Sequence, residues 1–124
     1  MCVGIPMRVL AVAPEGAGEG ERLLARCAPW PGDGSTGSDT IDTLLLGPVE
    51  EGEWLLTFLG AARERISAAE AAQIAAALAA LDVALQAAQD AAGSGAAIDP
   101  AAFDAFFPDL ANREPELPDH LKRP

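Results

Sequence analysis

Ser67-Ala68-Ala69-Glu70 divides the chain into two regions with different folding properties. Ser followed three residues later by Glu is the capping-box signature, in which each side chain binds the backbone N–H of the other residue. An alanine-rich run without Gly or Pro extends from there to Ala92, and Gly93-Ser94-Gly95 then supplies a helix stop. We therefore predict one long helix over residues 68–92.

The bulky side chains of this helix fall on one face. They are spaced by four, three and four residues, which is helical periodicity, and they are Ile74, Leu78, Leu81 and Leu85. This stripe is either a face that packs against a sheet or a seam between copies of the chain. Packing is favoured, because about two heptads are few for an independent coiled coil.

Before Ser67 the chain consists of short apolar runs separated by turns that contain Gly and Pro. We predict strands over residues 7–12, 40–46 and 53–60, and a short strand or an irregular edge over 22–27. Residues 62–66 form a short last strand or lead into the helix. Residues 28–38 predict a loop. This pattern favours a mainly β fold with a C-terminal helix, namely a small OB-like β-barrel, because closure of five strands removes exposed sheet edges.

The segment after the helix has a different composition. Asp99-Pro100 predicts the start of a short helix, with Asp99 as N-cap. Phe103, Phe106 and Phe107 then cluster, and they either pack back on the domain, which is favoured, or form a partner-binding motif. Residues 112–124 are rich in Pro and predict a flexible extended tail. The predicted organisation is a barrel over 1–66, a helix packed on it over 67–92 and a tail containing Pro and Phe over 93–124.

Charge excludes several classes of partner. The chain has 124 residues, with 19 Asp and Glu against 8 Lys and Arg and a net charge of −11. Nucleic acids and anionic membranes require a basic surface, so we expect neither as a partner. The long helix contains Glu70, Asp82 and Asp90 and is not expected to span a membrane. The N-terminus shows no basic region followed by a long apolar core, so we expect no signal peptide and a cytoplasmic protein.

Few residues are available for catalysis or metal binding. The chain has two cysteines, Cys2 and Cys27, no CxxC pair, and one histidine, His120. This excludes a disulfide framework and a multi-histidine metal site, and it makes a structural zinc site improbable. A thiol enzyme would lack a base to activate its nucleophile. Cys27 is expected to be a buried core residue, since free cysteine is commonly buried.

Cys2 opens the motif MCVGIPM and is the strongest candidate for chemistry. We expect removal of Met1 to leave a free amine beside its thiol, which lowers the thiol pKa and favours the thiolate that binds metals. Gly4 lets the backbone approach a ligand or partner closely, and Pro6 stiffens the exit into the first strand. The alternative is that Cys2 is an incidental N-terminal residue.

The stretch MCVGIPMRVL resembles the opening of the HypC/HupF/HoxL family of [NiFe]-hydrogenase maturation chaperones. The family signature is Met-Cys-apolar-Gly-apolar-Pro at the N-terminus, and Cys2, Gly4 and Pro6 match it. The stretch TIDTLLLGPVEEGEWLLTFLGAARERISAAEA is similar to the family's strand, acidic turn, aromatic strand and capped helix. The resemblance covers about residues 1–90, and the sequence after Ala92 has no counterpart in the shorter members. GIPM and FLGAARERIS favour the HupF/HoxL branch.

The resemblance implies a function and a site. Such proteins carry or hold the Fe(CN)2CO unit and deliver it to the immature [NiFe]-hydrogenase large subunit, after binding an iron-assembly scaffold protein of the HypD type. Cys2 is implied as the iron ligand, and Cys2, Gly4, Ile5, Pro6 and Met7 as partner contacts. A thiolate suits low-spin iron, because both are soft. No turnover is needed, so the chain is not expected to be an enzyme.

One departure from the family affects the ligand set. Shorter members carry a histidine two residues before the glycine of the aromatic strand, and here that position is Phe58. A second iron ligand is therefore not carried over, and His120 in the Pro-rich tail is a poor substitute. The alternative function is an OB-like adaptor that binds only protein and has no metal role.

Four other residues carry local predictions. Trp30 is either a partner contact or folds back on the barrel, and Trp54 is predicted to be core. Arg63 and Arg65 either pair locally with Glu64 or Glu70, which is favoured, or bind an acidic face of a partner.

Overall fold

The structure is a computed structural model that describes residues 3–94 and 99–123. The chain divides into two compact units, Met1–Ala75 and Ala76–Pro124. The first unit holds all the strands and the start of the long helix. The predicted packing of that helix on the barrel stays a prediction.

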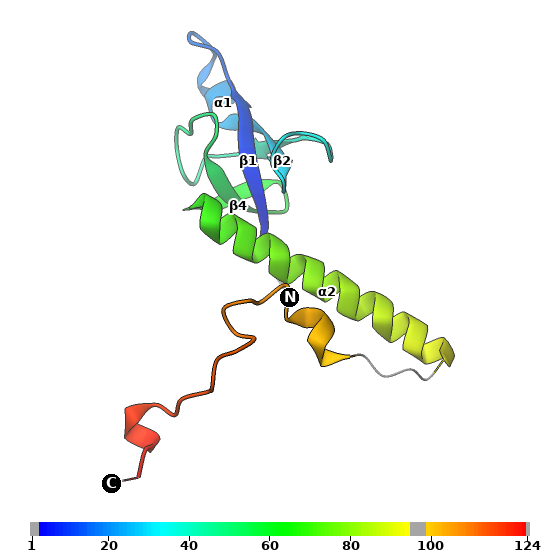
Figure 1. The fold of residues 1–124 in the computed structure, drawn as a ribbon. Helices are drawn as coiled ribbons and strands as arrows, with labels where there is room; N and C mark the ends of the chain where they lie inside the picture. Colours follow the sequence, from blue (N-terminus) through cyan, green and yellow to red (C-terminus); the bar gives the residue numbers. More distant parts are fainter. Residues whose placement is uncertain (1–2, 95–98, 124) are drawn as a thin grey trace. The chain divides into compact units, whose positions relative to one another are not determined.

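The first unit is a closed barrel of five strands in the order β1-β2-β3-β5-β4 (Figure 1). Its strands are β1 (Ile5–Val12), β2 (Leu24–Pro29), β3 (Asp39–Asp42), β4 (Trp54–Phe58) and β5 (Ala61–Ile66). Neighbouring strands are antiparallel except β3 and β5, which run parallel. The OB-like barrel predicted from the sequence is confirmed, and closure leaves no continuous sheet edge to be covered.

The barrel interior is filled by alternate residues of each strand. Leu55 and Thr57 face inward on β4, for example, while their neighbours face outward. The interior is narrow, as expected for five strands, and several of the side chains that fill it are small. The core cluster comprises Met7, Val9, Ala25, Cys27, Ile41, Leu55 and Ala62. The expected burial of Cys27 is confirmed.

The third strand is shorter than predicted. It ends at Asp42, because Thr43–Leu46 form a turn in which the Asp42 carboxylate accepts the Leu44 N–H at 2.8 Å. The backbone N–H and the hydroxyl of Thr43 both donate to the Leu23 carbonyl, at 2.7 and 2.9 Å. The two side-chain bonds, from Asp42 and Thr43, stabilise the turn, so the apolar run leaves the strand and Leu44 and Leu45 are exposed.

A second difference concerns the segment before β2. A short helix α1 (Glu19–Arg22) precedes β2, and β2 begins at Leu24 rather than at Arg22 as predicted.

Trp54 lies on the outer face of β4 rather than in the core. It is half-buried, and its ring contacts that of Trp30 with centroids 5.3 Å apart. A Cβ at Gly32 would lie 2.7 Å from Trp54 Cη2, so glycine allows this loop to approach the strand. Of the two predictions for Trp30, the structure has the one in which it folds back on the barrel.

The helix α2 (Ala68–Ser94) begins with the predicted capping box. The Ser67 N–H donates to Glu70 Oε2 at 2.8 Å, and the Glu70 N–H donates to Ser67 Oγ at 3.1 Å. Within the described residues it is the one helix long and apolar enough to cross a membrane, with a mean hydropathy of 1.5 over an 18-residue window inside Ala68–Gly93. Asp82 lies near the middle of the helix, and an aspartate at the centre of a membrane span costs about 3 kcal/mol. That the helix does not span a membrane stays a prediction.

The second unit contains two short 3-10 helices, η1 (Pro100–Phe103) and η2 (Asp119–Leu121). The predicted cap of η1 is confirmed, since Asp99 Oδ1 accepts the Ala101 N–H at 3.0 Å. Phe103, Phe106 and Phe107 are half-buried. The residues described after Asn112 are exposed, and η2 is their one regular element.

Arg65 fastens the connection between β3 and β4 to β5. Its guanidinium donates to the carbonyls of Leu46 at 3.3 Å and Pro48 at 2.6 Å, and its Nε lies 3.4 Å from Glu53 Oε1. The predicted local pairing is wrong for this arginine, because Glu70 serves the helix cap instead. A hydrogen-bonded arginine that binds two loop carbonyls is a structural residue.

Replacing this arginine tests that role. Arg65→Met keeps most of the apolar stem and removes the donors, and we expect the free energy of unfolding to fall by about 1 kcal/mol, since the group is partly solvated. Urea denaturation measures the change. Arg63→Met is the matched control and should change stability by less than about 0.5 kcal/mol, because Arg63 forms neither a hydrogen bond nor an ion pair with the described residues. Equal effects of both variants would contradict the assignment.

Candidate functional site

The N-terminal arm, residues 3–5 of the described chain, enters the barrel at the start of β1. Pro6 and Met7 follow it directly and are both buried. The arm is therefore fixed at its base, as the sequence predicted from Pro6. Cys2, the residue predicted to bind iron, lies outside the described residues.

Strand β4 holds the arm in place. Ile5 pairs with Thr57 and Pro6 with Leu56 across the antiparallel ladder. The Thr57 hydroxyl donates to the Ile5 carbonyl at 3.0 Å, which satisfies a buried side-chain oxygen. Sequence reasoning missed Thr57, although a threonine at an inward position of an apolar strand is a signal that its hydroxyl needs a partner.

Gly4 is seated against Leu56. A Cβ on Gly4 would lie 2.7 Å from Leu56 Cδ1 and 2.8 Å from Cγ, both closer than real Cβ contacts. The sequence predicted that Gly4 permits a close backbone approach. In the structure the Gly4 backbone approaches the Leu56 side chain of the same protein, and this contact holds the arm close to β4.

The predicted partner residues fall into two groups. Ile5 keeps 47% of its surface exposed, next to Val3, which was not among the predicted contacts and is 38% exposed, whereas Pro6 and Met7 are enclosed in the barrel unit. An exposed side chain can contact a partner directly, and a buried one acts by positioning its neighbours. Contact of a partner with Gly4, Ile5, Pro6 or Met7 remains a prediction.

The described residues provide no ready-made metal site. Among residues 3–94 and 99–123 no group of three or more His, Cys, Asp or Glu side chains is placed to hold a metal ion. Phe58 follows Thr57 at the end of β4, and a phenyl ring offers no donor atom. His120 is exposed in η2 of the second unit. Iron binding by Cys2 stays a prediction.

The thiol of the second cysteine, Cys27, is enclosed in the barrel. It is fully buried, its Sγ lies 3.8 Å from the Ala25 carbonyl, and burial raises the pKa of its thiol to about 11. A protonated, enclosed thiol is a poor nucleophile and a poor metal ligand. Cys27 is therefore a core residue, as the sequence predicted.

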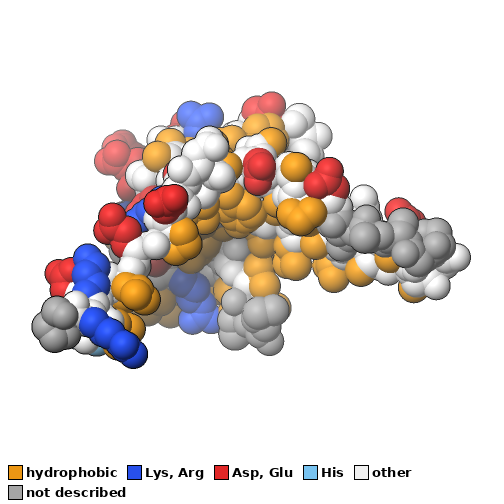
Figure 2. All heavy atoms as spheres, turned by 60° about the horizontal axis from the view of Figure 1, so that its bottom comes forward, with side chains coloured by type: hydrophobic (Ala, Val, Ile, Leu, Met, Phe, Trp, Pro, Cys, Tyr) orange, Lys and Arg blue, Asp and Glu red, His pale blue; other side chains and the backbone are white. Residues whose placement is uncertain are grey.

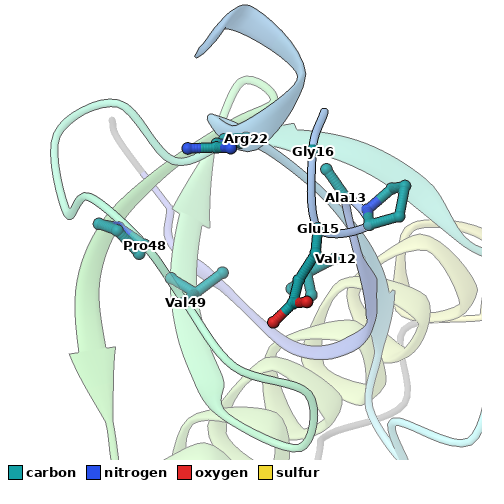
Figure 3. Close-up of a pocket in the computed structure, with 8 residues that line it drawn as sticks. Val12, Ala13, Glu15, Gly16, Arg22, Pro48 and Val49 are labelled. Atoms are coloured by element: carbon teal, nitrogen blue, oxygen red, sulfur yellow. The ribbon is translucent and has the colours of Figure 1, made fainter. Parts of the chain in front are cut away.

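A cleft of about 490 Å³ lies toward the other end of β1 (Figure 3). It is open and largely apolar, and the Glu15 carboxylate points into it near Val12 and Val49. Val12 ends the strand that Ile5 begins, so this cleft is separate from the arm. It contains neither a cysteine nor a histidine and adds nothing to the iron chemistry.

Comparison with known proteins gives consistent matches. A sequence model of the HupF/HypC family matches residues 1–78. The chain is 46% identical over 122 residues to the hydrogenase expression/formation protein HupN of Azotobacter chroococcum mcd 1, covering 98% of this chain and 90% of that protein. It is 43% identical to the hydrogenase expression/formation protein HoxL of Azotobacter vinelandii, covering 98% and 92%. It is 37% identical to the hydrogenase expression/formation protein HupF of Rhizobium leguminosarum bv. viciae, covering 98% of both chains.

These matches extend beyond the stretch that carried the resemblance. They cover 122 residues, so the segment after Ala92 has a counterpart in these three relatives. Their names agree with the branch that GIPM and FLGAARERIS predicted. No significant match was found among solved structures.

The contact between Gly4 and Leu56 predicts a specific rescue. Gly4→Ala should lower the free energy of unfolding by about 1–3 kcal/mol, because the new methyl group overlaps Leu56. Gly4→Ala combined with Leu56→Ala should cost less than the sum of the two single changes, because the space is restored. Denaturant unfolding of the four proteins measures this coupling.

Gly18→Ala is the control for this cycle, since a Cβ there meets nothing within 4 Å. Strict additivity of the Gly4 and Leu56 changes would show that the arm does not rest on Leu56.

Burial of Cys27 predicts protection from alkylation. In a Cys2→Ala variant, where Cys27 is the one remaining cysteine of the sequence, iodoacetamide at pH 8 should label the thiol only after unfolding in urea. The raised pKa also contributes stability below the ordinary thiol pKa of 9.0, and this is lost as the pH rises toward about 11. Mass spectrometry measures labelling, and rapid labelling of the folded protein would contradict the burial.

Proposed function

The chain belongs to the HupF/HypC family, and from this premise we propose that it is an accessory protein of [NiFe]-hydrogenase maturation that holds the Fe(CN)2CO unit through Cys2 and delivers it to the immature large subunit. Its relatives are hydrogenase expression/formation proteins that match over nearly their whole length. That agreement, over both the barrel and the tail, is the observation that carries the proposal.

The anchored arm supports Cys2 as the residue that presents the iron. Gly4 rests on Leu56, and the Ile5 carbonyl is held by Thr57. Two residues of extended chain span about 7 Å at most. Cargo on Cys2 would therefore stay within a short radius of the end of β4, which favours transfer to a protein docked there.

The chemistry of the cargo suits a single thiolate. Cyanide and carbon monoxide make iron low-spin and soft, and thiolate is a soft donor. Those three ligands already occupy half of an octahedral shell. One sulfur from this chain leaves positions for donors of the receiving protein, so that iron passes on by ligand exchange without any change in its three diatomic ligands.

The absence of a donor at Phe58 fits a carrier that must release its cargo. A second strong ligand from the same chain would slow exchange, whereas one thiolate holds the iron loosely until the partner supplies others. We propose binding and delivery rather than catalysis, with an iron-assembly scaffold protein of the HypD type as donor. The net charge of −11 argues against nucleic acid as a partner, and we place the exchange in the cytoplasm.

Infrared spectroscopy tests the proposal directly. Protein purified without oxygen from cells that express the maturation proteins should show cyanide and carbonyl stretching bands. Cys2→Ala should lose them and abolish hydrogenase activity without loss of fold, because the arm adds little to the core. Cys27→Ala is the matched control and should retain the bands, since Cys27 is enclosed.

Two outcomes would change the conclusion. Normal hydrogenase activity with Cys2→Ala would overturn the role of the thiol. No bands in any variant, with the partner still bound, would favour a protein-binding adaptor without a metal role.

A further inference from the structure

The turn between β4 and β5 carries a leucine in an unfavourable conformation. Leu59 has φ = +50° and Gly60 has φ = +78°, and Phe58 pairs with Ala61 on either side of them. Two-residue hairpin turns with positive φ at both positions favour Asn-Gly, because a branched side chain is strained there. Leu59 is also 87% exposed, so it gains almost nothing from burial.

Folding therefore does not explain the leucine. Both its backbone conformation and its exposure are unfavourable in the isolated protein. An observed strain of this kind is a reason to look for a function at the position.

Two further leucines lie beside this turn. Asp42, the last residue of β3, donates its N–H to the Gly60 carbonyl at 2.9 Å. Leu44 and Leu45 follow it and are 65% and 68% exposed. They line an open groove of about 210 Å³ together with Asp42, Ala61, Ala62 and Arg63.

The arm lies on the other flank of β4. Ile5, which is half-exposed, pairs with Thr57, two residues before Leu59. Ile5, Leu44, Leu45 and Leu59 thus surround the same end of β4, all within the first unit. We call these four residues the hairpin-tip surface. Scattered exposed leucines are ordinary, but several around one strained turn indicate an interaction site. Figure 2 shows the general setting: hydrophobic side chains are exposed between carboxylates on the face that it draws.

We propose that the hairpin-tip surface docks the immature hydrogenase large subunit, with Leu59 as the anchor side chain. This inference rests on the proposed function. Cys2 is joined to Gly4 by a tether of about 7 Å at most, so a protein that takes iron from Cys2 has to cover the side chains beside the arm. The arm and the surface then form one continuous interface.

Charge defines the chemistry of the partner's matching surface. Residues 1–75 contain eleven Asp and Glu against five Arg and no Lys. The hairpin-tip surface is therefore an apolar patch on an acidic unit, and it fits an apolar groove with basic residues at its rim. Desolvated apolar anchors supply most of the affinity in such an interface, while the rim charges speed association.

Leu59→Asn separates docking from folding. Asparagine adopts positive φ more readily than leucine, so the thermal midpoint should stay equal or rise. The affinity for the purified immature large subunit, measured by calorimetry, should fall at least about tenfold. The cyanide and carbonyl bands should remain, because Cys2 is unchanged.

Leu117→Asn is the control, since it removes another exposed leucine, 60% exposed against 87% for Leu59, from the second unit and should leave affinity unchanged. Leu44→Ser with Leu45→Ser is a second route to the same loss of affinity. Unchanged affinity in both hairpin-tip variants, with the wild type bound, would overturn the docking surface alone. A wild type that shows neither bands nor large-subunit binding would overturn the proposed function itself.

Discussion

The antiparallel pairing of β1 with β4 fixes the position of the N-terminal arm, on which the proposed function depends. It closes the barrel, and it sets Ile5 opposite Thr57 and Pro6 opposite Leu56. Closure buries Met7, and the Thr57 hydroxyl then binds the Ile5 carbonyl. A shift of one residue in this register would turn Met7 outward and free the arm. The arm is short and well anchored because one ladder performs both tasks.

The barrel also encloses one of the two cysteines. Cys27 occupies the narrow interior, where desolvation keeps its thiol protonated. Cys2 precedes the anchored segment by two positions, and it is the cysteine that we propose as a ligand. A thiol at the free end of a short tether can meet a partner's donors, whereas a thiol in the core cannot. Burial therefore makes Cys27 unsuited to the role that we propose for Cys2, although the two residues have the same side chain.

Two features at the end of β4 run against local folding preference. Leu59 takes a positive φ, and Leu44 and Leu45 leave the strand to become exposed. Sequences usually agree with their fold at every level, and the exceptions tend to mark sites that serve another purpose. Here the exceptions gather beside the arm. In the delivery that we propose, a receiving protein would have to reach the same place.

The sequence by itself determined the local elements and the family. The capping box at Ser67 and the cap at Asp99 could be predicted, because each depends on residues close together in the chain. The five-strand barrel could be predicted from the succession of short apolar runs and turns, and the local motif around Cys2 carried the resemblance to the family. Tertiary structure alone decided the end of β3, the outward position of Trp54, the contacts of Arg65 and the support of the arm by Leu56 and Thr57. These depend on residues such as Gly4 and Leu56, which are distant in sequence and meet only when the barrel closes. Periodicity shows that a residue faces inward or outward, but it does not show which side chain it will meet.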